Sequence, residues 1–148
     1  MRIYEVQDKK RYLPLLLIGD EQESMIDRYL DECRMYVLDA GGVRGEIAVC
    51  ELPDGVLEIK NLAVDPSHRR KGLGRALIEY VCERYRDRCA IVQVGTGNSP
   101  GTLGFYRKCG FEFSHVVQNF FVDHYDHPIV EDGVTLVDMI YLRKAIGR

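Results

Sequence analysis

One apolar segment, residues 56–64, leads through a basic turn into an amphipathic helix, and this order of elements limits the folds open to the chain. The segment ends at Asp65-Pro66, as expected of a strand buried on both faces. From Leu73 to about Asp87, apolar residues recur with helical spacing at positions 73, 76, 77, 80 and 81. The sequence therefore predicts a buried strand, a turn and a helix that packs against a core, with a parallel crossover at that helix.

The turn between strand and helix is positively charged. Arg70, Lys71 and Arg75 lie near the expected helix N-terminus, where the helix dipole disfavours cations. Gly72 and Gly74 remove two side chains, so backbone N–H groups can approach phosphate oxygens closely. The cations would add charge-assisted hydrogen bonds. The turn is thus predicted to bind a phosphate-rich cofactor.

Two familiar phosphate motifs do not match this turn. A dinucleotide fingerprint needs a third glycine where this chain has Leu77, and a P-loop needs Gly-Lys-Ser/Thr at the end of the turn. The arrangement Arg69-x-x-Gly72-x-Gly74 after residues 62–64 (Leu-Ala-Val) instead resembles the acetyl-CoA-binding motif of the GNAT superfamily of N-acetyltransferases.

Residues 97–111 resemble a later motif of the same family, in which a tyrosine on a short helix is followed by Gly-Phe. Here the tyrosine is Tyr106 and the pair is Gly110-Phe111. Ser99 suits the N-cap, Pro100 the first helical position, and Gly110 a left-handed C-cap. A short helix that ends in a tight turn is expected.

The second motif departs from the family at one position. Family members often carry an asparagine seven residues before the tyrosine, whereas Asn98 lies eight before Tyr106 and Ser99 occupies the seven-residue offset. Either residue is therefore a candidate for a cofactor contact. The resemblance covers about residues 45–111.

The remaining sequence fits one domain over residues 1–148 with the mixed, mostly antiparallel sheet of about seven strands that the GNAT resemblance implies. Asp20 and Glu23 resemble a capping box, and Gly41-Gly42 and the run Pro53-Asp54-Gly55 indicate turns. Strands are expected at 2–6, 35–39, 44–52, 56–64, 90–95, 111 to about 122, and 135–144. Helices are expected at 11–18, after Asp20, at 73–87 and around Tyr106. The resemblance implies that the two parallel strands joined by the 73–87 helix splay apart to admit the cofactor.

The resemblance implies that acetyl-CoA binds with its pyrophosphate on residues 70–75 and its pantetheine along the strand before them. The expected contacts are Leu62, Ala63, Val64, Arg69, Arg70, Lys71, Gly72, Leu73, Gly74, Arg75, Asn98, Ser99 and Tyr106. In the family, a backbone N–H of this strand polarises the thioester carbonyl, and Val64 is the candidate here.

Direct attack by an amine forms a tetrahedral intermediate, and the family implies that Tyr106 is the acid that protonates the leaving sulfur. Without the family context, Tyr106 would be interpreted as a half-buried packing tyrosine. Glu58 opens the cofactor strand, where some family members carry a catalytic carboxylate, and is a possible base. The alternative for Glu58 is a solvent-facing carboxylate.

Residues 123–133 combine two histidines with four carboxylates between two expected strands. Such loops often line substrate sites, so His124 and Glu131 are candidates for substrate binding: the loop's carboxylates would attract the amine, and His124 or His127 could relay its proton. The spacing matches no specific zinc pattern and the family chemistry needs no metal, so no metal site is expected. A hydrated acidic loop is the alternative.

A net charge of −3 and a pI near 5.8, with basic and acidic residues interspersed, argue against nucleic-acid binding. Five cysteines without a C-x-x-C pair are expected to be reduced and mostly buried. The start of the chain lacks a signal-peptide pattern and no apolar run is long enough for a membrane helix, so a cytoplasmic protein without membrane contact is expected. A monomer or a homodimer are both compatible with the sequence.

The sequence thus predicts an acetyl-CoA-dependent N-acetyltransferase that acts on a primary amine of a small molecule. A protein N-terminus or lysine is an alternative acceptor. The rival from another class is a non-catalytic acyl-CoA-binding or regulatory module, which could lose Tyr106 freely.

Overall fold

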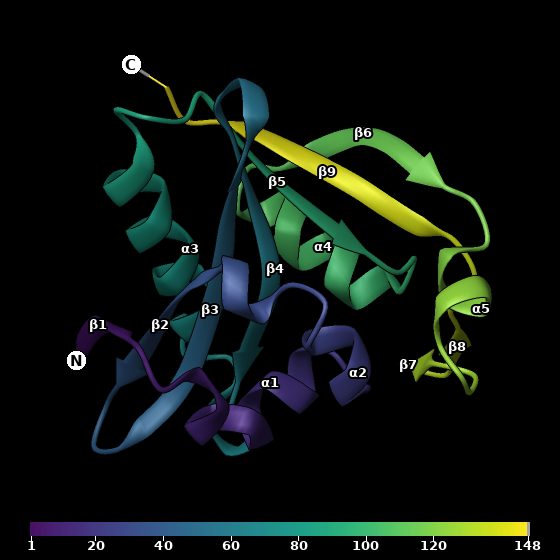
Figure 1. The fold of residues 1–148 in the computed structure, drawn as a ribbon, viewed down its shortest axis with the longest axis horizontal. Coiled ribbons are helices and arrows are strands. Elements are labelled where there is room, and N and C mark those ends of the chain that lie inside the picture. The colour runs from purple at the N-terminus through teal and green to yellow at the C-terminus, as the bar shows by residue number, and fades with distance from the viewer. Residues whose placement is uncertain (148) are drawn as a thin grey trace.

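The computed structural model describes residues 1–147, and its main element is a seven-stranded sheet with the strand order β1-β2-β3-β4-β5-β9-β6 (Figure 1). Every neighbouring pair is antiparallel except β4 and β5, which are parallel. The predicted mixed, mostly antiparallel sheet is therefore confirmed. Its strands are β1 (Arg2–Val6), β2 (Arg34–Asp39), β3 (Val43–Leu52), β4 (Val56–Val64), β5 (Ile91–Thr96), β6 (Glu112–Val117) and β9 (Met139–Ala145).

Helices cover both faces of the sheet. They are α1 (Leu13–Gly19), α2 (Glu23–Ile26), α3 (Leu73–Tyr85), α4 (Pro100–Lys108) and α5 (Phe120–His124). Helices α3 and α4 enclose the larger core, which contains Leu77, Val81 and Phe111, and α1 and α2 cover a second core around Leu16 and Val37 (Figure 1). Each buried aliphatic or aromatic side chain of this kind contributes about 1.5–3 kcal/mol. No helix within residues 1–147 is long and apolar enough to cross a membrane.

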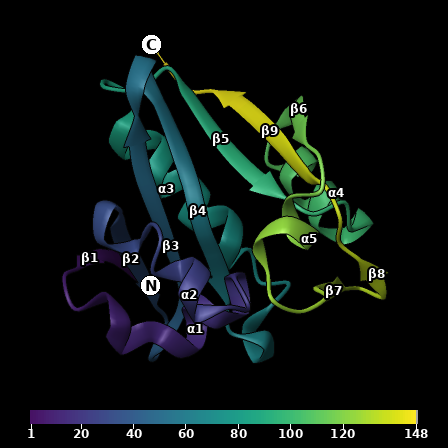
Figure 2. The same cartoon turned by 45° about the vertical axis from the view of Figure 1, so that its right-hand side comes forward.

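The parallel strands β4 and β5 pair over only part of their lengths. Residues 56–59 pair with residues 91–94, and beyond Ile59 and Val94 the two strands separate. Figure 2 shows β3 and β4 diverging from β5 and β9 below this point. The sheet therefore has a fork, defined here as the place after Ile59 where β4 leaves β5. This fork bears out the expected splayed strand pair.

Two local expectations are wrong. Asp20 does not cap α2: the N-cap is Gln22, without a side-chain cap, and Asp20 instead accepts hydrogen bonds from two tyrosines. The strand expected from 111 to about 122 ends at Val117, because Asn119 adopts a left-handed backbone (φ 58°) and α5 follows. A small hairpin, β7 (Val130–Glu131) and β8 (Val134–Thr135), occupies part of the expected loop.

The expectation that all cysteines are reduced is also wrong. Cys33 and Cys50 form a disulfide with a Cα–Cα distance of 4.6 Å, whereas Cys82, Cys89 and Cys109 are free and buried. The cause is the register of β2 and β3. Arg34 pairs with Val49, so Cys33, just before Arg34, lies opposite Cys50, just after Val49. An odd total of cysteines does not exclude one pair.

We expect reduction of the Cys33–Cys50 disulfide to lower the free energy of unfolding by about 3 kcal/mol, because a bond across 17 residues restricts the unfolded chain. Urea unfolding with and without reductant measures this difference. A Cys33→Ala/Cys50→Ala variant is the control and should not respond to reductant. Equal stabilities of the oxidised and reduced wild type would contradict the expectation.

Candidate active site

The turn before α3 leaves the N-terminus of that helix open. Its N-cap is Gly72, which adopts a left-handed backbone (φ 77°) and has no side-chain cap, and a Cβ added there would meet nothing within 4 Å. The first backbone N–H groups of α3 therefore have no intrahelical partner and face outward. An anion can approach them without a steric obstacle.

The predicted cations lie around this opening. Arg69, Arg70 and Lys71 are exposed, and within residues 1–147 none of them makes a hydrogen bond or an ion pair. Arg75 differs, because its Nε pairs with Glu79 Oε1 at 3.0 Å on the helix surface. The turn thus presents three uncompensated positive charges beside an open helix N-terminus, which is the arrangement expected for a pyrophosphate site.

Gly74 allows α3 and α4 to approach closely. A Cβ at Gly74 would lie 3.1 Å from Phe105 Cζ and 3.7 Å from Val64 Cγ2. The glycine therefore brings together the end of β4, the first turn of α3 and the middle of α4. Residue 74 has a packing role, whereas Gly72 has a conformational one.

Leu62 and Val64 present unpaired backbone groups at the fork. The Asp65 amide donates to the Arg44 carbonyl at 2.7 Å across the antiparallel β3–β4 pair. The direction of the backbone N–H groups alternates along such a strand pair. The N–H of Ala63 therefore also points to β3, whereas the N–H groups of Leu62 and Val64 point to the opposite edge of β4. That edge lies beyond the last β4–β5 pair and is free to bind an extended ligand.

Tyr106 lies on α4 as predicted and is buried, with 7 % of its surface exposed. Its ring packs edge-to-face with Phe111, with 5.5 Å between the ring centroids. Desolvation is the main cause that raises the pKa of Tyr106, and the nearby Cys109, Glu131 and Glu46 add to it. The phenol therefore remains protonated at neutral pH and can donate a proton.

The structure assigns different environments to the two candidates before α4. Ser99 is the N-cap: its hydroxyl accepts from the Thr102 amide and donates to Asp132 Oδ2 at 3.0 Å, and the residue is fully buried. Asn98 is exposed. Of the two, Asn98 has the side chain available to a ligand.

Glu58 is held by two side chains, one on β4 and one on β5. It is 7 % exposed, so the solvent-facing interpretation is wrong. Gln93 Nε2 donates to Glu58 Oε1 at 2.5 Å, and Lys60 Nζ to Glu58 Oε2 at 2.7 Å. Arg143 Nε donates to Gln93 Oε1 at 2.8 Å and fixes the orientation of that amide. Glu58 is therefore a fixed carboxylate on the sheet face that α1 and α2 partly cover.

A second polar group on that face joins distant parts of the chain, and sequence reasoning missed it. Asp20, before α2, accepts from Tyr29 at 3.1 Å and from Tyr125 at 2.6 Å. Asn61 Nδ2 donates to the Tyr29 hydroxyl at 3.1 Å. Desolvation raises the pKa of Asp20. These contacts tie the segment after α5 to α1, α2 and β4.

Glu46 is a buried carboxyl that sequence reasoning also missed. It lies on β3 opposite Ala63, is fully buried, and neither of its carboxyl oxygens has a hydrogen-bond partner among the described residues. Burial raises the pKa of Glu46 to about 8, so the group holds a proton at neutral pH.

The two residues predicted to bind substrate contact different parts of the structure. His124 is exposed, and its Nδ1 lies 3.4 Å from Arg28 Nη1. Glu131, on β7, accepts from the Thr102 hydroxyl of α4 and adds to the electrostatic environment of Tyr106. Neither residue contacts Glu58. No group of three or more possible metal ligands gathers in the part of the chain that the structure describes.

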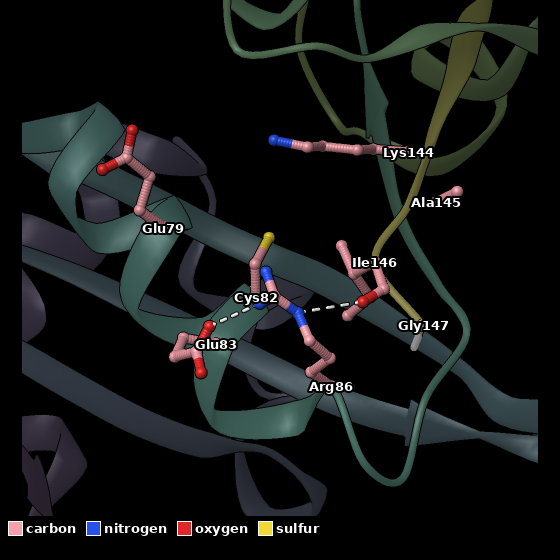
Figure 3. Close-up of a pocket in the computed structure, with 8 residues that line it drawn as sticks. All are labelled: Glu79, Cys82, Glu83, Arg86, Lys144, Ala145, Ile146 and Gly147. Atoms are coloured by element: carbon pink, nitrogen blue, oxygen red, sulfur yellow. Dashed lines mark hydrogen bonds and ion pairs between the residues drawn. The ribbon is translucent and has the colours of Figure 1, made fainter.

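A pocket of about 600 Å³ lies between α3 and the end of β9 and is lined in part by Glu79 and Cys82 of that helix (Figure 3). Its cation Arg86 is engaged by the Ile146 carbonyl at 3.1 Å and by Glu83 at 2.7 Å. Lys144 donates to the Cys109 carbonyl at 2.7 Å. Both cations thus already have partners, and none of the predicted site residues lines the pocket.

Comparison with known proteins gives one family. A family model described as an acetyltransferase (GNAT) domain matches residues 31–113. An uncharacterized N-acetyltransferase, YvbK of Bacillus subtilis (strain 168), is 34 % identical over 131 residues, which cover 86 % of this chain and 84 % of that protein.

Solved structures share the whole fold. An IAA acetyltransferase from Bacillus cereus ATCC 14579 superimposes with a TM-score of 0.91 and 32 % identity, covering 97 % of this chain and 98 % of the other. A GNAT family acetyltransferase from Elizabethkingia anophelis, solved with acetyl-CoA bound, gives a TM-score of 0.91 and 30 % identity, with 97 % of each chain covered.

Proposed function

Because the chain belongs to the GNAT family of acetyltransferases, we propose that it transfers an acetyl group from acetyl-CoA to a primary amine of a small molecule. The observation that carries the proposal is the fork. There the free edge of β4, the open N-terminus of α3 and the fixed carboxylate of Glu58 lie along one short stretch of chain.

The cradle at α3 suits the pyrophosphate of acetyl-CoA, which supplies an activated acetyl group as a thioester. The N–H groups after Gly72 and the free charges of Arg69, Arg70 and Lys71 would hold the phosphates. Arg75 would contribute once it leaves Glu79. Asn98 is the candidate for a further contact, in preference to the buried Ser99.

The free edge of β4 suits the pantetheine arm and the thioester carbonyl. We assign the Val64 N–H to the carbonyl, and the Leu62 N–H, on the same edge, to the arm. One fixed donor to a developing oxyanion contributes about 3–4 kcal/mol to catalysis. The rigid antiparallel pairing with β3 would keep this donor in place.

Proton transfers would use Glu58 and Tyr106. Glu58 takes the proton of the acceptor ammonium, and its position is fixed by Gln93 and, through Gln93, by Arg143. The buried, protonated Tyr106 donates to the leaving sulfur. General acid and base contributions of this kind are each about 10²-fold or more.

A small acceptor is favoured by the contacts that cross the sheet face beside Glu58. Tyr125 reaches Asp20, the Asp126 amide donates to Gln22 Oε1 at 3.1 Å, and His124 lies against Arg28. These contacts join the segment after α5 to the α1–α2 region and limit the room for an extended peptide. A location in the cytoplasm, and a monomer or homodimer, remain expectations from the sequence.

The proposal is tested by release of CoA thiol from acetyl-CoA over a panel of small primary amines and N-terminal peptides. Acceptor-dependent release with small amines, and slower release with peptides, is the expected result. Tight CoA binding without release for any acceptor would instead identify a non-catalytic module, and release with peptides alone would identify a protein acetyltransferase.

We expect an Arg70→Ala/Lys71→Ala variant to bind CoA about 10- to 100-fold more weakly, because two charge-assisted contacts to phosphate are lost. The loss should shrink at high salt, since exposed charges are screened. Calorimetric titration with CoA at two salt concentrations measures it. Arg88→Ala, at an exposed arginine paired with Glu51, is the matched control, and an unchanged Kd in the double variant would remove the turn from the cofactor site.

A further inference from the structure

Lys60 occupies the base of the fork. Ala48 pairs with Asn61 and Val49 with Ile59, so Lys60 is the extra residue of a β-bulge in β4. Ile59 is also the last residue of β4 that pairs with β5. The bulge therefore lies where the two parallel strands separate, between Glu58 and the free edge at Leu62.

The Lys60 ammonium sits among the groups that an acceptor amine would need. Its Nζ lies 2.7 Å from Glu58 Oε2 and 5.4 Å from the centre of the Tyr29 ring. The positive charge of Lys60 also favours the ionised form of the Asp20 carboxyl. A carboxylate, an aromatic face and a second acidic group form a typical ammonium site. An internal amine thus occupies the position expected for the substrate amine, and its side chain is 30 % exposed.

We propose that Lys60 is a self-acetylation site, modified by the acetyl-CoA bound to its own chain. This inference rests on the proposed function, because it uses the same thioester, base and acid. Lys60 is the lysine beside the proposed base, and its flexible stem starts two residues before Leu62, about 7 Å along the strand.

The transfer balances as follows. Glu58 takes one proton from the Lys60 ammonium, and the freed Nζ lone pair forms a bond to the acetyl carbonyl carbon. The carbon–sulfur bond breaks and its electron pair leaves with sulfur, which takes the Tyr106 proton. Tyr106 regains a proton from the acylated nitrogen, and Glu58 releases its proton to water. The products are acetyl-lysine, CoA thiol and one proton.

The other lysines have different surroundings. Lys9 donates to the Leu30 carbonyl, Lys10 pairs with Glu23 and Asp27, and Lys144 donates to the Cys109 carbonyl. Lys71 belongs to the proposed phosphate cradle, and Lys108 is exposed outside it. None of these contacts includes Glu58, so a reaction that depends on Glu58 should select Lys60, whereas direct chemical acetylation by acetyl-CoA should favour exposed lysines.

Acetylation would change the site it occurs in. The acetylated nitrogen is uncharged, so the ion pair to Glu58 Oε2 is lost and only Gln93 still holds the carboxylate. The competing internal ammonium is then removed from the acceptor position. Self-acetylation would therefore prepare Glu58 to receive the proton of an external amine.

The test is incubation of the purified protein with acetyl-CoA and no acceptor, followed by peptide mass spectrometry over time. Acetylation of Lys60 is expected to approach one group per chain, at least about tenfold faster than at Lys108, and Glu58→Gln and Tyr106→Phe should each slow the acetylation of Lys60 by about 10²-fold. Neither variant should alter the exposed lysines. Lys60→Arg keeps the positive charge and should lack the fast modification.

Two results would overturn the inference: an unmodified Lys60 in protein saturated with acetyl-CoA, or a Lys60 acetylation rate equal to that of Lys108 and unaffected by Glu58→Gln. The proposed function is judged separately, by thiol release with added amines. CoA thiol release that depends on an added amine, with Lys60 unmodified, would reject self-acetylation alone. Fast acetylation of Lys60 without amine-dependent thiol release would reject the small-amine function alone.

Discussion

A Tyr106→Phe variant is expected to lose about 10²-fold or more in kcat, because the phenyl ring keeps the packing against Phe111 but has no proton for the leaving sulfur. The KM for acetyl-CoA should change by less than about twofold, since the hydroxyl is needed only as the thiolate forms. Steady-state thiol release with a good acceptor measures both constants.

Tyr80→Phe is the matched control for Tyr106→Phe. Tyr80 lies on α3 with its ring against Tyr36 at a centroid distance of 5.4 Å, on the same side of the sheet as Tyr106. Its variant should keep the wild-type kcat. An unchanged kcat in Tyr106→Phe would show that Tyr106 is not the general acid. A lower melting temperature with an unchanged kcat would indicate a packing role instead.

A Glu46→Gln variant is expected to be more stable than the wild type by on the order of 4 kcal/mol near pH 8, and by only about 1 kcal/mol near pH 5. Burial raises the pKa of Glu46 to about 8 in the folded state. In the pH window between the ordinary pKa of a glutamate and about 8, the unfolded chain therefore releases a proton that the folded chain keeps. The folded state then binds more protons, and wild-type stability falls as pH rises through this window. A neutral amide removes the dependence.

Urea unfolding at both pH values checks this expectation, with Glu79→Gln as a control at an exposed glutamate. The readout is the change with pH in the stability difference between variant and wild type, so any fixed effect of the amide cancels. A difference that is independent of pH would show that Glu46 does not titrate in this way.

The features around α3 and α4 were predictable because their causes are local. A capping serine at Ser99, a left-handed Gly110 (φ 96°) and apolar spacing along α3 each depend on a few adjacent residues. The end of the chain was less predictable, because the left-handed Asn119 that stops β6 and begins α5 has no strong local signal.

The polar face beside Glu58 could not be predicted from local patterns. Asp20 and Tyr125 are 105 residues apart, and their hydrogen bond depends on how α1 and the segment after α5 pack together. The Cys33–Cys50 bond depends likewise on strand register. A glutamate in a strand usually indicates a solvent-exposed position, so the burial of Glu46 follows only from the cover that the helices provide.

A crystal structure of the protein with acetyl-CoA or CoA tests the central claim most directly. The pyrophosphate is expected at the N–H groups after Gly72, beside Arg70 and Lys71, with the pantetheine along the edge of Leu62 and Val64 and the sulfur at the fork near Glu58 and Tyr106. A cofactor bound elsewhere, for example in the pocket between α3 and β9, with the fork unoccupied, would contradict the account.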